Sequence, residues 1–142
     1  MKKLLVLALS LLLIVGCSKD VPETKVAELK DGTYTADSNP DEWGGKINVS
    51  LEVKDGKITA CEIKNLDNEG KEKDEDYGKE DGKITNPGLY KIAQNAVESA
   101  QQYPQELIET QDIDQVEVIS GATVSHQSFK EAVEKALEMA IE

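Results

Sequence analysis

Two runs of strand-like sequence, 46–53 and 58–63, are joined by Asp55-Gly56. In the first run apolar and polar residues alternate, which places the apolar side chains on one face of a β-strand. Asp-Gly between two such runs is a strong signal of a two-residue hairpin turn. The predicted apolar face comprises Ile47, Val49, Leu51 and Val53, with Cys61 and Ile63 on the returning strand. This hairpin constrains the fold most, because its apolar face requires a covering layer.

Two helices are predicted to supply that layer. Asn86 suits the N-cap and Pro87 the first position of one helix, which ends or breaks at Pro104. Both helices have apolar residues at i, i+3, i+4 and i+7 spacing. They are Leu89, Ile92, Ala93, Ala96, Val97 and Ala100 in the first, and Phe129, Ala132, Val133, Ala136, Leu137 and Ala140 in the last.

Two shorter strands are expected as well, at 33–35 and at 114–120, the second with Val116 and Val118 on one face. The predicted fold class is therefore α+β, with an antiparallel or mixed sheet built on a β-hairpin and two amphipathic helices packed on it.

Residues 65–88 are highly charged and nearly free of apolar side chains, which is typical of a surface loop. One spacing in this segment resembles the calcium loop of an EF-hand, with Asn65, Asp67, Glu69, Gly70 and Asp76 at positions 1, 3, 5, 6 and 12. The twelfth ligand of an EF-hand is a glutamate, and a helix precedes the loop. Here the twelfth residue is aspartate and a strand precedes it, so a solvated loop is predicted and no metal site.

The chain begins with two lysines and an apolar run from Leu4 to Val15. This run is shorter than the roughly 20 residues that a membrane-spanning helix needs, and it fits a secretory signal peptide. Ile14-Val15-Gly16-Cys17 resembles a bacterial lipobox, in which the cysteine is lipidated. We therefore expect a signal peptide at 1–16, a lipid-anchored tether at 17–30 and one domain at 31–142. A disulfide between Cys17 and Cys61 is the alternative, and it would compete with lipidation.

The charge of the chain excludes two classes of partner. Without the two leader lysines, 14 lysines stand against 28 acidic residues, which gives a net charge of −14. Such a surface repels nucleic acid and anionic lipid headgroups, so neither is an expected partner.

Ser120-Gly121-Ala122-Thr123 lies between a predicted strand and the last predicted helix. Gly121 permits a tight turn, and the first turn of a helix has unpaired N–H groups that favour an anion. Ser120, Thr123 and Ser125 add hydroxyl groups. The segment is thus a candidate phosphate site, although serine and threonine at a helix start are often only caps.

The stretch Glu117-Val-Ile-Ser-Gly-Ala-Thr-Val-Ser125 resembles the flavinylation motif of the FMN-binding domain family. Residues 31–63, with Trp43-Gly44-Gly45, resemble the opening strand, Gly-Gly loop and hairpin of that family. Residues 86–102 and 128–137 resemble its middle and closing helices, so the resemblance covers roughly residues 31–140. The FMN-binding domain family includes lipoproteins of extracellular electron transfer.

The resemblance implies that a flavin transferase joins Thr123, through its oxygen, to the phosphate of FMN. Ser120, Gly121 and Ala122 would form the recognised turn and Ser125 the later hydroxyl, while Glu117 stands where the family usually has aspartate. The implied role is electron transfer at the extracytoplasmic face of the membrane. The membrane electron donor would be a quinone or an NADH dehydrogenase system.

Single residues near the predicted cofactor have two interpretations each. Trp43, beside Gly44 and Gly45, is a candidate to cover the flavin ring or, alternatively, a packing residue at the hairpin edge. Tyr34 is interpreted as a sheet residue and Tyr77 as an exposed loop residue, with flavin contact as the alternative. His126 is a candidate near the cofactor phosphate, since the sequence offers it no acid-base partner.

Two other functions remain open at this point. One is a non-redox binding lipoprotein on the same scaffold, for which Glu117 in place of aspartate is the support. The other is a flavin-dependent reductase, which needs an open pocket beside the ring.

Overall fold

The computed structural model describes residues 28–141. Three antiparallel strands form one sheet in the order β1-β2-β3, namely β1 (Gly32–Asp37), β2 (Lys46–Lys54) and β3 (Lys57–Leu66). Asp55 and Gly56, between β2 and β3, have φ angles of 52° and 70°. Two successive left-handed residues are what a type I′ hairpin turn requires, so the predicted hairpin is confirmed.

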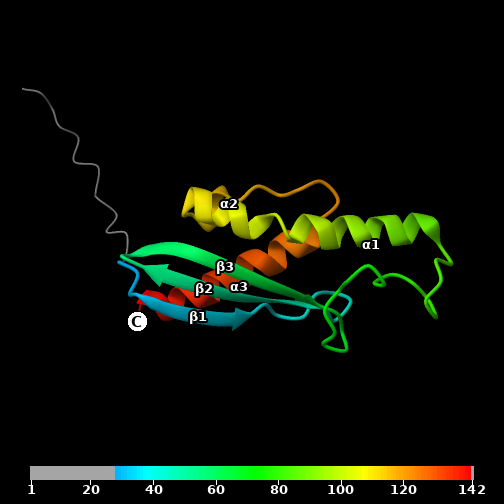
Figure 1. Ribbon diagram of the computed structural model, residues 1–142, viewed down its shortest axis with the longest axis horizontal. Helices are drawn as coiled ribbons and strands as arrows, with labels where there is room; N and C mark the ends of the chain where they lie inside the picture. Colours follow the sequence, from blue (N-terminus) through cyan, green and yellow to red (C-terminus); the bar gives the residue numbers. More distant parts are fainter. Residues whose placement is uncertain (1–27, 142) are drawn as a thin grey trace, which may run out of the picture.

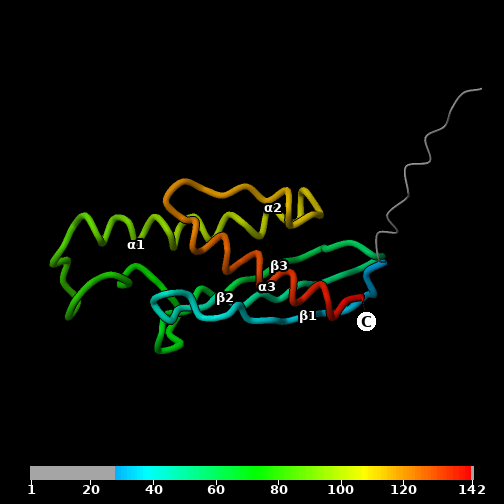
Figure 2. Tube along the Cα trace, turned by 180° about the vertical axis from the view of Figure 1, so that it is seen from behind, coloured from blue at the N-terminus to red at the C-terminus, as the bar shows by residue number. Residues whose placement is uncertain are grey.

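The helices follow the sheet in the chain as α1 (Pro87–Ala100), α2 (Tyr103–Thr110), the short 3₁₀ helix η1 (Ile113–Gln115) and α3 (Thr123–Ile141). Figures 1 and 2 show α3 running along one face of the sheet, while α1 extends past the end of the strands. The contacts agree, because α3 packs on β1 and β2, α2 packs on β3, and α1 packs mainly on α3.

The core lies between the sheet and α3. On β2 the predicted apolar face is confirmed, since its four residues are at most 2% exposed. Opposite them, α3 contributes fully buried side chains at helical spacing, and α2 adds Tyr103 and Leu107. The α3 residues are Phe129, Ala132, Val133, Ala136 and Ala140. The α+β fold class is thus confirmed.

The predicted strand at 114–120 is wrong. Residues 113–115 form η1, whose N-cap Asp112 accepts the N–H of Asp114, and the chain then continues without strand pairing. Val116 is buried, whereas Val118 is 53% exposed, so the two do not share a face. The N–H of Glu117 donates to a side-chain oxygen of Glu106 rather than to a strand.

The sequence did not predict α2. Pro104 does follow the end of α1, but it lies in the first turn of α2, where its missing N–H has no cost. Beyond the end of α2, the Gln111 side chain accepts the N–H of Ile58 at 2.9 Å and donates to its carbonyl at 2.8 Å. This amide takes the place of a neighbouring strand on β3.

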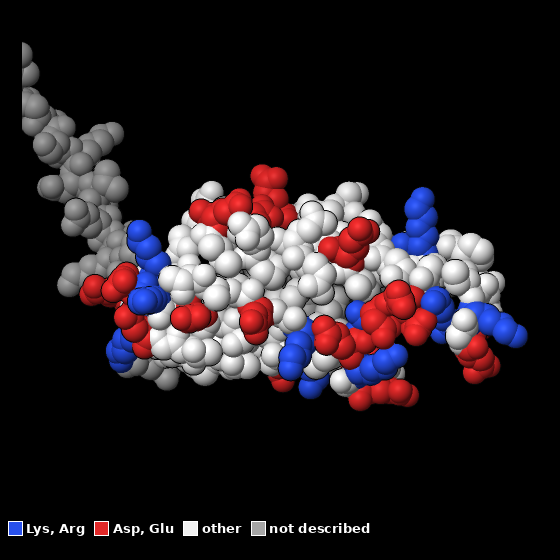
Figure 3. All heavy atoms as spheres, in the orientation of Figure 1, with Lys and Arg blue, Asp and Glu red and all other residues white. Residues whose placement is uncertain are grey.

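The segment after β3 is irregular, with turns at four residues of positive φ, Gly70, Gly78, Asp81 and Gly82. The Asp67 carboxylate accepts the N–H groups of Glu69 and Lys71 from its own loop. Within residues 28–141 there is no cluster of histidine, cysteine, aspartate or glutamate side chains that could hold a metal ion. Figure 3 shows lysines and acidic residues interspersed at this end of the molecule.

The N-terminal prediction falls largely outside the described residues, and Cys17 lies there. At the start of the described part, Leu29 packs against the core and the N–H of Lys30 donates to the carbonyl of Ala140. None of the helices in this part is both long and apolar enough to cross a membrane. Cys61 is half-buried against the core, and burial raises the pKa of its thiol to about 12, with Glu62 adding to the effect.

Candidate functional site

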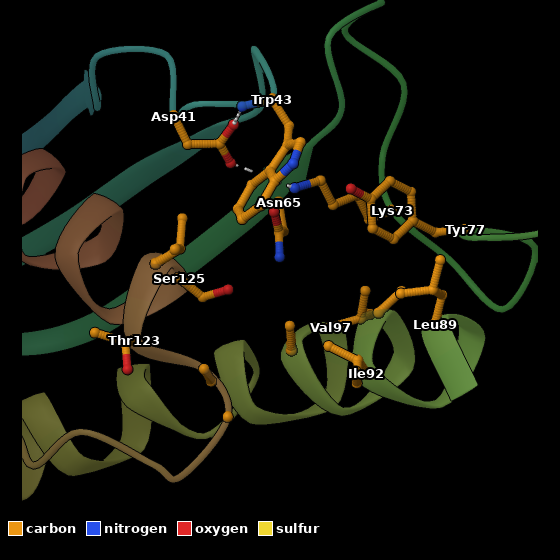
Figure 4. Close-up of a pocket in the computed structure, with 15 residues that line it drawn as sticks. Asp41, Trp43, Asn65, Lys73, Tyr77, Leu89, Ile92, Val97, Thr123 and Ser125 are labelled. Carbon is orange, nitrogen blue, oxygen red and sulfur yellow. Dashed lines mark hydrogen bonds and ion pairs between the residues drawn. The ribbon is translucent and has the colours of Figure 1, made fainter. Parts of the chain in front are cut away.

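A cavity of about 430 Å³ lies between α1, the start of α3 and the loops after β1 and β3. Figure 4 shows its two sides, with α1 forming one wall and Trp43, Asn65, Lys73 and Tyr77 facing it. Residues of the Gly121 turn and of the first turn of α3 close one end.

The wall formed by α1 is apolar and uncovered. Leu89 and Ile92 are 63% and 62% exposed, and they line the cavity together with Ala93, Ala96 and Val97. Trp43, which is 64% exposed, lies across from them. Large apolar side chains that face a cavity mark a ligand-binding surface. Trp43 is therefore not a buried packing residue, and this alternative is wrong.

The turn at 119–122 is closed by a hydrogen bond of 3.0 Å from the N–H of Ala122 to the carbonyl of Ile119. Gly121 has a φ of 83°, the conformation that the third residue of a type II turn needs. A Cβ on Gly121 would lie 2.9 Å from the side-chain nitrogen of Asn95. That nitrogen donates to the carbonyl of Ser120, so α1 holds the turn from one side.

The start of α3 has no side-chain cap. The residue before the helix is Ala122, whose carbonyl accepts the first helical hydrogen bond from His126. Within the described residues, the N–H groups of Thr123, Val124 and Ser125 have no acceptor. Ser120 and Thr123 are exposed, and neither hydroxyl makes a hydrogen bond to the described part of the chain. These unpaired N–H groups and the partial positive charge of the helix start favour a bound phosphate.

Core residues fix the position of this turn. The hydroxyl of buried Tyr103 donates to the carbonyl of Ala122 at 3.3 Å and accepts the N–H of Ile119 at 3.4 Å. Burial raises the pKa of Tyr103, so its hydroxyl stays protonated and able to donate. His126 packs edge-on against the Tyr103 ring, and its Nε2 donates to the carbonyl of Val116 at 2.8 Å. His126 thus braces the segment before the turn and does not line the cavity.

The other end of the cavity is organised by Asp41. Its Oδ1 accepts the N–H groups of Trp43 and Gly45, at 2.9 and 2.8 Å, and its Oδ2 lies 3.8 Å from Nζ of Lys73. Nζ of Lys73 also lies 4.8 Å from the centre of the Tyr77 ring. Tyr77 lines the cavity, so its alternative interpretation as a residue near the ligand is supported.

The structure brings together part of the predicted site. Gly121, Ala122, Thr123, Ser125 and Trp43 line one cavity, although 80 residues of sequence separate its two ends. The remaining predicted residues lie outside the lining. Gly44, with a φ of 83°, and Gly45 lie behind Trp43. Ser120 contributes its carbonyl to the turn, and Glu117 lies in a separate groove beside Glu106 and Glu109.

Sequence reasoning did not identify Asp41, Asn65, Lys73 and Asn95 as site residues. Asp41 had one usable signal, because an aspartate two residues before Trp43 can accept N–H groups of its own turn. Asn65 and Lys73 had no such signal, since they lie in a charged run whose spacing indicates only a loop.

The cavity is lined by apolar and aromatic side chains and lies next to a helix start without a side-chain cap. These features suit a ligand that has both a flat ring and a phosphate. A family model of the FMN-binding domain matches residues 42–138. The chain belongs to this family and is an FMN-binding protein, which confirms the resemblance noted in the sequence.

Two of the solved structures that are similar to this chain come from species of Clostridium. The crystal structure of the CPE2226 protein from Clostridium perfringens is 34% identical, with a TM-score of 0.62 over 79% of this chain and 88% of that chain. A solution NMR structure of a protein from Clostridium thermocellum is 27% identical, with a TM-score of 0.50 over 80% of this chain and 94% of the other. A search of curated proteins gave no match.

Proposed function

We propose that the chain is an electron carrier in which FMN is held covalently, through a phosphoester between its phosphate and the Oγ1 atom of Thr123. The observation that carries this proposal is the position of Thr123. It is exposed at the uncapped start of α3 and lines an apolar cavity, in a chain of the FMN-binding domain family. Relative to free FMN and free threonine, the linkage forms with loss of one water.

The residues present fit this cofactor. A cavity of about 430 Å³ lies within the range of roughly 300–1,000 Å³ that is typical of small-molecule sites. The unpaired N–H groups of the α3 start can bind phosphate oxygens, and the small residues Gly121 and Ala122 allow close approach. The apolar side chains of α1 and the Trp43 ring offer a surface for a flat ring system.

When bound, the flavin supplies the redox chemistry, and the protein supplies position and electrostatics. The phosphoester prevents loss of a small cofactor outside the cell membrane. Asp41, Lys73 and Tyr77 are the titratable residues that line the cavity. Asp41 and Lys73 pair with each other, and Lys73 lies over the Tyr77 ring. Because these three residues interact with one another, they favour an electron carrier over a reductase, which would need a side chain that activates its substrate.

The proposal includes lipidation at Cys17, which supports a location at the extracytoplasmic face of the membrane. Its basis is the charged start, apolar run and lipobox-like ending of residues 1–17. A membrane donor, either a quinone or an NADH dehydrogenase system, would reduce the cofactor, and a second carrier or a terminal acceptor would oxidise it.

The intact mass of the full-length chain, co-expressed with a flavin transferase, tests the covalent linkage. We expect a gain of one FMN less one water. This gain should disappear in Thr123→Val and persist in Thr33→Val, a matched substitution at an exposed position of β1.

An unchanged mass, with a positive-control substrate labelled in the same cells, would instead favour the non-redox binding lipoprotein. Rapid turnover of the loaded chain with a soluble donor and a soluble acceptor would favour the reductase.

A further inference from the structure

We propose that Asn65 and Lys73 form the polar contact for the flavin ring, and that the Lys73 ammonium raises the reduction potential of the bound cofactor. This inference rests on the proposed function, because it assigns roles in the same cavity. The two residues lie across from the α1 wall, Asn65 near the end of β3 and Lys73 in the loop that follows (Figure 4).

Asn65 is a buried residue whose amide has no hydrogen-bond partner in the described part of the chain. The residue is 3% exposed and lines the cavity, and its side chain makes no hydrogen bond to any residue of 28–141. Every fully enclosed side-chain nitrogen or oxygen in that part of the chain does have a partner. The Asn65 amide therefore borders the open space, and Figure 4 shows it directed into the cavity. In the unloaded protein water can pair with this amide, so a ligand that enters the cavity must replace those hydrogen bonds, which favours a ligand with polar groups at this place.

The chemistry of an amide fits a flavin ring. An asparagine side chain presents an acceptor and a donor side by side. The polar edge of the isoalloxazine ring carries carbonyl and N–H groups that can accept and donate in turn. The apolar wall of α1 suits the faces of the ring, and Asn65 is the buried polar group that can fix its edge.

Lys73 is a buried cation that retains hydrogen-bonding capacity. Its side chain is 10% exposed, and that of its partner Asp41 is 9% exposed. The Nζ atom lies 3.8 Å from the Asp41 carboxylate, beyond a hydrogen bond, and 4.8 Å from the Tyr77 ring centre. Because a lysine ammonium has three donors, Nζ can still donate to a ligand in the cavity.

Two backbone features fix the position of the Lys73 ammonium. A Cβ on Gly45 would lie 2.8 Å from Nζ of Lys73 and 2.9 Å from Oδ2 of Asp41. The N–H of Lys73 donates to the carbonyl of Asn65 at 2.7 Å, so the two proposed contacts are held together. Gly45, a candidate cofactor contact in the sequence, does not line the cavity and instead makes room for the ion pair.

A cation at this place affects the two redox states unequally. The reduced flavin carries more negative charge than the oxidised ring, so a nearby ammonium stabilises it and raises the potential. The effect is strong because Lys73 is shielded from solvent and screened less than a surface lysine. Removing Lys73 also leaves the Asp41 carboxylate at the cavity without its partner, and both changes lower the potential.

The test compares Lys73→Gln with Lys71→Gln in the covalently loaded full-length chain. Lys71 is in the same loop, its side chain is 63% exposed, and it pairs with Asp74. In Lys73→Gln we expect about a tenfold weaker preference for the reduced over the oxidised cofactor. This fold-change lowers the two-electron midpoint potential by about 30 mV. Lys71→Gln should leave the potential unchanged, and Lys73→Arg should restore most of it.

Asn65→Leu tests the second contact on the unloaded chain, by titration with free FMN and detection of flavin fluorescence. We expect about a tenfold higher dissociation constant than for the wild type, with an unchanged urea midpoint as the sign of an intact fold.

Failure of this inference is distinct from failure of the proposed function. A chain that is loaded normally, but in which Lys73→Gln and Lys71→Gln have equal potentials and Asn65→Leu binds FMN like the wild type, would overturn only the assignment of the ring contacts. A wild-type chain that is not loaded would overturn the covalent linkage, and the FMN titration would still decide the ring contacts. If FMN neither loads nor binds, both proposals are overturned.

Discussion

Helices α1 and α3 carry apolar residues at the same spacing, yet their apolar faces have opposite surroundings. On α3, Phe129 and Val133 are completely buried against the sheet, whereas on α1 Leu89 and Ile92 are more than 60% exposed along the cavity. Periodicity therefore predicts a helix and the direction of its apolar face, but not what that face contacts. In this protein one apolar face is part of the core and the other lines the cavity.

The starts of the two helices also differ, but in the opposite direction from their apolar faces. Asn86 caps α1 by accepting the N–H groups of Gly88 and Leu89 at 3.1 Å each. At α3 the capping position holds Ala122, and the first N–H groups are free within the described part of the chain. The helix whose apolar face lines the cavity has a capped start, and the helix whose apolar face forms the core has an uncapped one. In the proposed binding mode, α1 would contact the ring with its side and α3 would contact the phosphate with its first turn.

The largest effect is expected in the core face of α3. Phe129→Ala removes a fully buried ring that stacks on Tyr103 with 5.6 Å between centroids. We expect a loss of about 3–5 kcal/mol in the free energy of unfolding, measured by urea denaturation. Met139→Ala on the same helix, at a residue 40% exposed, should cost far less. Equal losses in the two variants would contradict the assignment of this face to the core.

A smaller effect is expected at the open start of α3. Gly121→Ala forces an L-residue into a φ of 83° and crowds the Asn95 amide, with an expected loss of about 1–2 kcal/mol. Gly70→Ala is the matched control, because Gly70 has a φ of 80° and no atom within 4 Å of an added Cβ. The difference between the two variants isolates the contact with Asn95. A larger loss for Gly70→Ala would show that Asn95 does not constrain the turn.

The closed start of α1 should lose about 1 kcal/mol in Asn86→Ala, because two N–H groups lose their acceptor. Gln102→Ala is the control, since Gln102 is the N-cap of α2 without a side-chain hydrogen bond. Thermal and urea unfolding should both separate the variants, with Gln102→Ala close to wild type. Identical unfolding curves for the two would remove the contrast between capped and uncapped starts.

The smallest effect on stability is expected on the exposed face of α1. Ile92→Ala should change the free energy of unfolding by no more than about 0.5 kcal/mol, since the side chain is 62% exposed, while FMN binding weakens. Ile84→Ala, at an exposed position outside the cavity lining, should affect neither quantity. A loss of stability close to that of Phe129→Ala would mean that the α1 face is core after all.

The sequence predicted the elements whose signals are local. The alternation of β2, the Asp-Gly turn and the Asn-Pro helix start each follow from neighbouring residues, and each is confirmed. The Gly-Ala-Thr turn was correctly placed before the last helix, but the strand predicted on its other side is wrong, since η1 precedes it.

Features that depend on distant residues were not predictable. Extended sequence at 116–119 resembles a strand, but side chains of Glu106 and Tyr103 take its N–H groups. Lys73 faces the cavity because the loop after β3 folds back toward α1, where the Gln94 side chain donates to the carbonyls of Asp74 and Tyr77. Asn65, near the end of β3, borders the same cavity. Nothing in the local composition of a charged loop specifies such a return.

The length of α3 sets the distance between the cavity and the N-terminal start of the described chain. The helix begins at the cavity and ends beside Lys30, close to the start of the described chain (Figure 1). At a rise of about 1.5 Å per residue, its 19 residues separate these two places by roughly 28 Å. From Cys17 to Glu28 a fully extended chain reaches on the order of 40 Å. For a chain anchored at Cys17, the cavity is thus at the far end of the molecule from its attachment. In the proposed lipid-anchored protein, a partner arriving from outside would meet the cavity first, whereas a donor within the bilayer would reach it when the domain tips toward the membrane.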